Sequence, residues 1–423
     1  MRSRSTLAAL ALACLCGGCG SSAPSGGDPA VTLTNTASRT PVARDCTGAS
    51  LEALERVGHS LYEESATGRI VAQASSRLAG SQPLAAAVAR GDAAASMRVL
   101  RGLLRNQIVS VRVQRAGRTL ARIARGAGIA PAQGRLVLGR QTVGTFTVSV
   151  QGANGYAQTA SGLTATQVVM RSGRRVLAST LHAVPGALRA NQHAATISGV
   201  GYRVDTFAGR AFPDLPLTVS LLVPESSLPA GCPHGGAGVS TPQARANAWG
   251  RVAERVYDAE HLGGKAQRIL DIVERSPAFR AAVSAGDAQA TRAAIIGFFR
   301  AHLHIVRVRV ERAGRLLVDV GGPYVLAPIP GVIRGPHGEV VARFELAIQD
   351  DLGFTILARA FTGAQTLMRI GQRQVMGTLR PGPARIPDRG PVSYRGVAYQ
   401  AYSFNGEAFP SGPLRISLLY PAS

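Results

Sequence analysis

An alternation of hydrophobic and polar residues recurs in two widely separated parts of the chain. Residues 108 to 121 read IVSVRVQRAGRTLA and residues 305 to 318 read IVRVRVERAGRLLV, with ten of fourteen positions identical at an offset of 197. In the second segment Val306, Val308 and Val310 alternate with charged residues, which predicts a strand with one buried and one solvent-exposed face. The next four residues, Arg312-Ala313-Gly314-Arg315, predict a hairpin turn with a positive φ at Gly314.

Helical periodicity precedes both of these segments. Apolar residues from Trp249 to Val273 recur mostly at three- and four-residue steps and predict one long helix, and Leu51 to Leu61 predict its equivalent in the first half. Ser276-Pro277 predicts the N-cap and first residue of a short helix. Asp92 and Asp287 stand at the next N-cap positions, so we expect them to cap helices and not to catalyse.

The repeat extends over most of the chain. Met170-Arg171 matches Met368-Arg369 at an offset of 198, and matches resume at 197 near the end of each copy. A period near 200 is far longer than that of a solenoid. Each copy predicts an α+β domain, a long and a short helix packed on a curved antiparallel sheet of about five strands. We expect a first repeat over residues 46–232, a linker over 233–245 and a second repeat over 246–423.

The N-terminus resembles a bacterial lipoprotein signal. Basic residues at positions 2 and 4 precede an apolar stretch from Leu7 to Leu15, and Gly17-Gly18-Cys19 follows. This resemblance implies cleavage after residue 18, acylation of Cys19 and a membrane anchor made by lipid, with residues 19–45 as a flexible tether. Cys16 stands where an aliphatic residue is usual. The alternative is an ordinary secretory signal cut elsewhere, and both place the protein outside the cytoplasm.

Two cysteines remain after this processing. In an oxidising compartment Cys46 and Cys232 are most economically joined as a disulfide that closes the first repeat at its base. The alternative is two free thiols, because sequence does not show how far apart their Cα atoms lie.

Composition narrows the possible classes of function. The chain has 423 residues, 46% of them hydrophobic, which excludes wholesale disorder, a coiled coil or collagen. The formal net charge is +23, yet Lys265 is the only lysine and no basic run appears. We therefore expect no nucleic-acid partner.

Both copies resemble Cache domains, the PAS-like extracytoplasmic sensor modules of bacterial receptors. The resemblance rests on the long helix, on the strand-turn-strand IVRVRVERAGRLLVDVGGP and on ARFELAIQDDLGF. It implies a small-molecule ligand, such as an amino acid or carboxylate, held in a pocket on one face of the sheet. Cache receptors usually signal through a membrane helix, whereas the last predicted strand here ends close to Ser423. We therefore expect an integral membrane signalling partner.

Five residues are candidates for that ligand site. Asp350 and Asp351 form either a solvated turn or an amine- or cation-binding site. Arg171 and Arg369 recur in both copies, where the resemblance places the roof of the pocket, and act either as carboxylate clamps or as exposed arginines. Tyr324 follows the hairpin and either forms a pocket wall or packs in the core.

No motif points to an enzyme. Nucleophile, zinc-protease and phosphate-loop signatures are absent from the sequence, and the pair His302 and His304 has no third ligand at metal-binding spacing. We expect no catalytic residue, metal or cofactor. The sequence favours a lipid-anchored extracytoplasmic sensor that captures a small metabolite and presents it to a membrane partner. The alternative is a structural lipoprotein that binds anionic envelope polymers through an arginine-rich surface.

Overall fold

The computed structural model describes residues 31–32, 46–104, 108–182, 192–227, 240–301, 304–323 and 326–422. The chain forms two compact units that divide between Thr241 and Pro242. We call the part before this division the first unit and the part after it the second unit. The division lies within the stretch expected to link the two repeats.

The first unit begins with four helices. They are α1 (Cys46–Thr67), α2 (Arg69–Ala79), α3 (Gln82–Ala89) and α4 (Ala93–Leu103). Strands β2 (Ser110–Arg115), β3 (Arg118–Ala124), β4 (Gly128–Ile129), β5 (Ala132–Leu138), β6 (Gln141–Ser149) and β7 (Gln151–Gly152) follow. After helix α5 (Ala153–Thr164) come β8 (Gln167–Ser172), β9 (Arg175–Ser179), β10 (Ala194–Ile197), β11 (Val200–Ala211) and β12 (Leu215–Pro224). Strand β1 (Val31–Thr32) pairs with β10, and a short 3-10 helix (Glu225–Ser227) follows β12.

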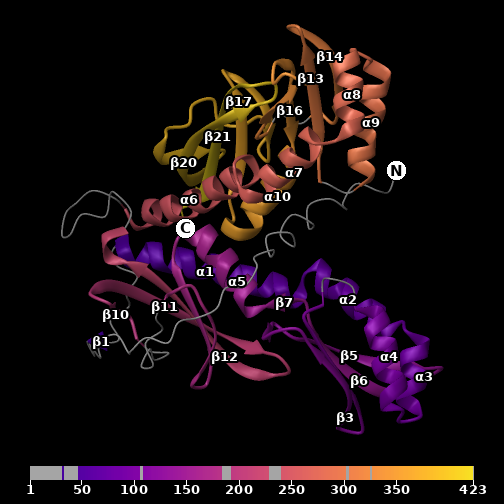
Figure 1. Cartoon of the computed structure of the whole chain (residues 1–423). Helices are drawn as coiled ribbons and strands as arrows, with labels where there is room; N and C mark the ends of the chain where they lie inside the picture. The colour runs from indigo at the N-terminus through magenta and orange to yellow at the C-terminus, as the bar shows by residue number, and fades with distance from the viewer. Residues whose placement is uncertain are drawn as a thin grey trace. The chain divides into compact units, whose positions relative to one another are not determined.

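The second unit repeats this order. Its helices are α6 (Thr241–His261), α7 (Gly264–Glu274), α8 (Pro277–Ala285) and α9 (Ala288–Arg300). Strands β13 (Arg307–Arg312), β14 (Arg315–Gly321), β15 (Ile329–Arg334) and β16 (Val340–Ala347) follow. Helix α10 (Asp351–Thr362) then leads to β17 (Gln365–Ile370), β18 (Arg373–Gly377), β19 (Arg389–Tyr394), β20 (Val397–Ala408) and β21 (Gly412–Pro421). The two units therefore share one element order, apart from β1, β4, β7 and the 3-10 helix of the first unit (Figure 1).

The strand pairing is equivalent in the two units. The smaller sheets have the orders β3-β2-β6-β5 and β14-β13-β16-β15, and the larger ones run β10-β11-β12-β8-β9 and β19-β20-β21-β17-β18. Val113 lies opposite Phe146, and Val310 lies opposite Phe344, at the repeat offsets. Even the β-bulges recur, after Val113 and after Val310. All these pairs are antiparallel, as an α+β domain predicts.

The number of sheets per copy differs from the prediction. Each copy holds a four-stranded sheet and a second, larger sheet, where the sequence predicted one sheet of about five strands. Helix α10 separates the two sheets along the chain in the second unit, whereas in the first unit β1, β4 and β7 of the larger sheet precede α5. The apolar spacing of Phe354, Ala358 and Phe361, all buried on α10, is helical. No helix is predicted at this position from the sequence, and only Asp350 and Asp351 are interpreted there, as a turn or a binding site.

Local signals at the helix ends and in the hairpin are confirmed, with one exception. Ser276, Asp92 and Asp287 each accept a hydrogen bond from a backbone N–H of the helix they cap. Gly314 has φ +74° in the β13–β14 turn. The exception is Leu262, which was expected on the buried stripe of one long helix but is 64% exposed, because that helix breaks into α6 and α7.

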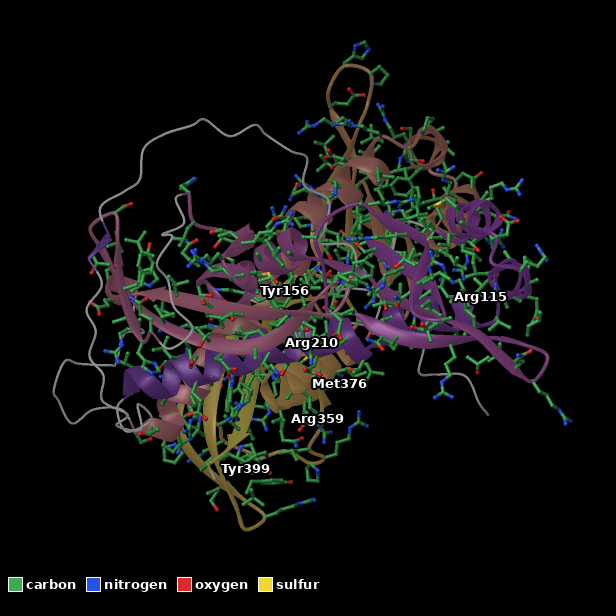
Figure 2. All side chains as sticks on the ribbon, turned by 90° about the horizontal axis from the view of Figure 1, so that it is seen from below. Arg115, Tyr156, Arg210, Arg359, Met376 and Tyr399 are labelled. Atoms are coloured by element: carbon green, nitrogen blue, oxygen red, sulfur yellow. The ribbon has the colours of Figure 1, made fainter. Side chains whose placement is uncertain are left out.

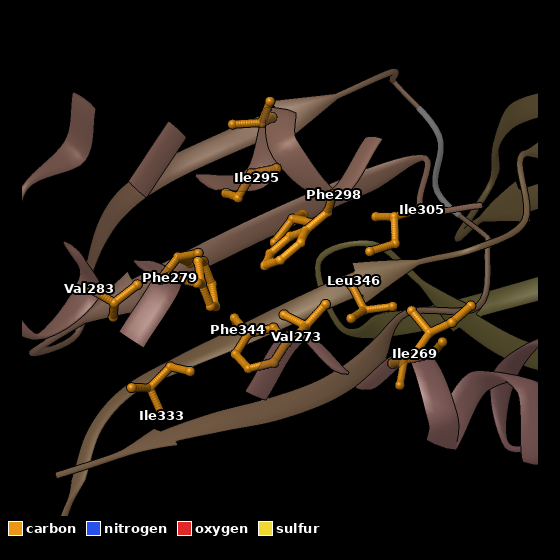
Figure 3. Close-up of a cluster of buried hydrophobic side chains, with 14 of the residues drawn as sticks. Ile269, Val273, Phe279, Val283, Ile295, Phe298, Ile305, Ile333, Phe344 and Leu346 are labelled. Carbon is orange, nitrogen blue, oxygen red and sulfur yellow. The ribbon is translucent and has the colours of Figure 1, made fainter. Parts of the chain in front are cut away.

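Each four-stranded sheet is covered on one face by three helices. In the second unit, residues of α7, α8 and α9 pack on alternate residues of the sheet, with Phe279 against Phe298 and Phe344 at ring-centroid distances of 5.6 Å (Figure 3). The first unit has an equivalent core beneath α2, α3 and α4. The other face of each sheet carries the polar residues of the alternation.

Each long helix is tied to a larger sheet by a tyrosine. The Tyr62 hydroxyl donates to the carbonyl of Arg210 at 3.0 Å, and the Tyr257 hydroxyl accepts from the N–H of Glu407 at 2.7 Å. Each ring passes close to a glycine of β11 or β20, Gly209 or Gly406. A side chain at either glycine would collide with the tyrosine ring.

Replacement of Gly406 with alanine is therefore expected to destabilise the protein by about 1–3 kcal/mol, the usual cost of overpacking. The added Cβ would lie 2.8 Å from Cζ of Tyr257. Denaturant unfolding measures the change. Gly297→Ala in α9 is the control, because its Cβ meets nothing within 4 Å and alanine favours a helix. A loss of stability in the control equal to that in Gly406→Ala would contradict this explanation.

Candidate functional site

A cavity lies on the polar face of the four-stranded sheet in both units. In the first unit it measures ≈ 310 Å³, and its polar lining residues are Arg112, Gln114, Gln133, Arg135, Thr145 and Thr147. In the second unit it measures ≈ 400 Å³, and its polar lining residues are Glu274, Arg309, Glu311, Arg343, Glu345 and Ser411. Phe146 and Phe344 line the two cavities at equivalent positions. The two sites are thus copies of one site with different chemistry.

Strand alternation places these side chains. Val111 and Val113 of β2 are fully buried on the helix side, so the neighbouring residues Arg112 and Gln114 face the other way. Antiparallel register then sets the neighbours of Arg112 on adjacent strands, which are Arg122 of β3 and Thr147 of β6. In such pairs the Cβ atoms lie within about 4.5–5.5 Å.

In the second unit the central arginine is neutralised by its neighbours. Arg309 lies opposite Asp319 and Glu345 in register. Its guanidinium is 2.8 Å from the Glu311 carboxylate and 3.6 Å from that of Asp319. Asp319 also receives hydrogen bonds from Arg307, and this bonding lowers the pKa of the Asp319 carboxyl. The positive charge on this face is therefore balanced internally.

Each carboxylate around Arg309 is replaced in the first unit. At the repeat offsets, Asp319 corresponds to Arg122, Glu345 to Thr147 and Glu311 to Gln114. Arg112 consequently faces a second arginine across the strand pair, where like charges destabilise a sheet. Its Nε is buried and has no hydrogen-bond partner in the part of the chain that the structure describes. We call Arg112, Arg122 and Arg135 the arginine face.

Two further cavities of the first unit are also basic. One, of ≈ 420 Å³, is lined by Arg101, Arg122 and Arg125 among apolar residues, and another, of ≈ 490 Å³, is lined by Arg122 and Arg175. No carboxylate lines these cavities or the one at Arg112. Basic side chains are spread over both units, as Figure 2 shows, so arginine content alone marks no site. The distinguishing feature is arginine in a cavity without a nearby carboxylate.

The predicted carboxylates lie at the start of α10. Asp350 is the N-cap and accepts a hydrogen bond from the N–H of Gly353. Asp351 is the first helical residue and is buried. Neither residue lines any of the four cavities described above. Their expected role in holding an amine or cation stays a prediction.

The predicted arginines lie on equivalent strands of the larger sheets. Arg369 of β17 donates from Nη1 to the carbonyl of Ala384 at 3.0 Å and from Nη2 to the carbonyl of Pro383. Arg171 of β8 is partly buried, and desolvation lowers its pKa. Neither lines the four cavities. The structure therefore does not group them with the arginine face, and their role as clamps stays a prediction.

Three of the singled-out residues, Tyr324, Cys19 and Cys232, lie outside the described residues. Cys46, the first residue of α1, is disulfide-bonded. Its pairing with Cys232 stays a prediction, as do the acylation of Cys19 and the pocket role of Tyr324.

Sequence reasoning missed the arginine face, although a signal was present. The residues that are identical in the two copies fall on core positions such as Phe146 and Phe344. The arginine face is visible in the differences between the copies, where a carboxylate in one copy stands against an arginine in the other. Alignment at an offset of 197 pairs Arg122 with Asp319 directly.

Comparisons with known proteins add little to this description. No family model matches the chain, and no curated protein matches it. Among solved structures, the periplasmic domain of LuxQ from Vibrio cholerae is similar to 43% of this chain over 98% of its own length, with 10% identity and a TM-score of 0.26. A TM-score this low does not establish a shared fold, so the proposals below depend on the chain's own residues.

The described residues contain neither a helix suited to cross a membrane nor a cluster of metal ligands. No helix there is both long and apolar enough to cross a membrane. No group of three or more histidine, cysteine, aspartate or glutamate side chains there is arranged to hold a metal ion.

Proposed function

We propose that this protein is an extracytoplasmic sensor that captures a small metabolite of the carboxylate or amino-acid type on the arginine face of its first unit. The signal-like N-terminus supports secretion and a lipid anchor at Cys19, and an integral membrane protein would then receive the ligand-bound form. One observation supports the ligand class above all others. Arg112 lies in a cavity from which every carboxylate present around Arg309 has been replaced.

The chemistry of the cavity suits a carboxylate. A guanidinium presents a planar set of donors that binds a carboxylate through two parallel hydrogen bonds. Gln114, Gln133, Thr145 and Thr147 line the same cavity and offer neutral donors and acceptors to the rest of a ligand. The volume lies at the lower end of the range of about 300–1,000 Å³ typical of ligand sites. A bound anion would also relieve the repulsion between Arg112 and Arg122.

Replacement of Arg112 with glutamine is expected to weaken binding of carboxylates about tenfold or more, because a charge-assisted hydrogen bond contributes about 1.5–3 kcal/mol. The full chain is first screened by thermal shift against carboxylates, amino acids, polyamines and nucleobases. A ligand at 100 times its dissociation constant stabilises the protein by about 2.7 kcal/mol. Calorimetric titration of the best carboxylate then compares wild type with Arg112→Gln.

The matched control is Arg309→Gln in the second unit. This variant loses the ion pairs with Glu311 and Asp319, so it is expected to lower stability and leave carboxylate affinity unchanged. Equal loss of affinity in both variants would contradict a site on the first unit. Binding to a polyanionic polymer, with steep salt dependence and no effect of Arg112→Gln, would instead favour the structural lipoprotein.

A further inference from the structure

The largest of the four cavities described here lies between the two sheets of the first unit. It measures ≈ 490 Å³ and is bordered by β3, by the residues leading into β4, and by the hairpin ends of β8–β9 and β11–β12. Its lining residues are Arg122, Ala124, Gly126, Ala127, Gly128, Ser172, Arg175, Leu177, Ala211, Phe212 and Leu215. It has no lining residue in common with the cavity at Arg112, although Arg122 is the cross-strand neighbour of Arg112.

The lining combines two cations with an apolar wall. Arg122 and Arg175 supply the charge, and Leu177, Phe212 and Leu215 supply the apolar surface. Leu215 is 50% exposed, so its side chain is accessible from solvent, whereas Phe212 is buried. The Arg122 guanidinium carbon lies 5.7 Å from the centre of the Phe212 ring. A ligand held here would meet positive charge and aromatic surface together.

The second unit has different side chains at the equivalent described positions. There the Arg307 guanidinium lies 4.3 Å from the centre of the Phe409 ring and 2.7 Å from the Asp319 carboxylate. The corresponding residues in the first unit are Ser110 for Arg307 and Arg122 for Asp319. The Ser110 hydroxyl donates to the carbonyl of Gly126 at 3.3 Å and is too short to reach over the ring.

These replacements change both the size and the charge of the site. An internal ion pair stacked on a phenylalanine in one copy becomes an open, purely cationic cavity in the other. Leu215, at the opening, corresponds to Gly412. Compared with the second unit, the first unit therefore has more apolar surface and one carboxylate fewer at this place.

We propose that this cavity binds the apolar body of a carboxylate ligand, so that the preferred ligands are aryl or branched-chain carboxylates and not short polar acids. The inference rests on the proposed function, because it assigns a narrower class of carboxylate to a second cavity of the same unit, which has no lining residue in common with the cavity at Arg112. Arg122 and Arg175 hold the carboxylate, and the ring or branch lies between Phe212, Leu177 and Leu215. Aromatic contact and burial together favour phenylacetate over acetate by about tenfold or more.

The test is calorimetric titration of the full chain with phenylacetate and with acetate. Wild type is expected to bind phenylacetate about tenfold or more tightly than acetate. Arg175→Gln removes one cation, and Leu215→Glu places a negative charge at the opening. Each is expected to weaken phenylacetate binding about tenfold. Both residues are exposed, so the variants are expected to fold.

Matched variants control for general effects of substitution. Arg174→Gln changes an exposed arginine of the same hairpin that does not line the cavity, and Leu215→Gln is the neutral counterpart of Leu215→Glu. Both are expected to bind phenylacetate to within about twofold of wild type. Equal affinity of wild type for phenylacetate and acetate, or unchanged phenylacetate affinity in Arg175→Gln or Leu215→Glu, would overturn the inference.

The two proposals fail in different ways. In one outcome, short carboxylates bind in an Arg112-dependent manner and a phenyl ring adds no affinity. This result supports the proposed function and rejects the proposal that the apolar cavity binds the ligand. If no carboxylate of either kind binds, both are rejected.

Discussion

Replacement of Lys265 with methionine is expected to destabilise the protein by about 3–5 kcal/mol at neutral pH, because it leaves a buried carboxylate without its partner. Lys265, the only lysine of the chain, lies 3.3 Å from Glu260, and both side chains are less than a tenth exposed. Denaturant unfolding at pH 7 measures the loss. Arg275→Met is the control, because its ion pair with Asp271 is exposed and contributes at most about 1 kcal/mol.

The loss of unfolding free energy in Lys265→Met is expected to become smaller as the pH falls. Burial raises the pKa of the Glu260 carboxyl above its ordinary value of 4.5, and the nearby ammonium opposes that rise. Without Lys265 the pKa in the folded state rises further above that of the unfolded chain. The Glu260 carboxyl then binds a proton more readily in the folded state than in the unfolded chain. Protonation removes the buried charge, so the destabilisation is smaller at low pH and larger at high pH. Unfolding at pH 5 and pH 7 tests this sign.

A double variant separates the ion pair from packing. Glu260→Gln combined with Lys265→Met removes the buried charge, so it is expected to recover much of the stability and to lose the dependence on pH. If the double variant were as unstable at pH 7 as Lys265→Met alone, the loss would come from the shape of the lysine stem and not from the unpaired carboxylate.

Replacement of Phe344 with alanine is expected to cost about 3–5 kcal/mol, the range for removing a buried aromatic ring. Phe344 is 2% exposed, packs edge-on against Phe279 and lies over Gly331, where a Cβ would come within 2.3 Å of its Cζ (Figure 3). The helices on this face cannot move in fully to fill the space. Denaturant unfolding with an unchanged m-value measures the loss.

Leu316→Ala on the neighbouring hairpin strand is the control for Phe344→Ala. Leu316 is 53% exposed, so its truncation is expected to change stability by no more than about 0.5 kcal/mol. Similar losses of stability in the two variants would show that burial of the Phe344 ring does not stabilise this core.

The two copies have kept their cores and diverged on the polar faces of their smaller sheets. Val113 and Phe146 are identical to Val310 and Phe344, whereas Arg122 stands against Asp319. Close packing restricts the buried positions, and the solvent-facing positions are free to change charge.

Much of the secondary structure was predictable, and most of the site was not. Asp92, Asp287 and Ser276 were correctly predicted as caps, and Gly314 as a turn residue. The candidates Asp350, Asp351, Arg171 and Arg369 instead came from comparison of the two copies, and the family resemblance placed the two arginines at a pocket. Asp350 lies at a helix N-cap, and Arg369 binds backbone carbonyls. Arg112 could not be predicted from its own sequence context, because many arginines in this chain lie on the polar faces of strands.

Sequence was sufficient for the duplication, the α+β class, the capped helices and the β13–β14 hairpin, because each depends on neighbours within a few residues or on repetition along the chain. It did not show that each copy divides its strands between two sheets, or that Arg112 faces Arg122. Those features depend on which strands pair and in what register. Pairing is set by the packing of distant segments around a shared core, and a one-residue shift in register would place every one of these side chains on the opposite face.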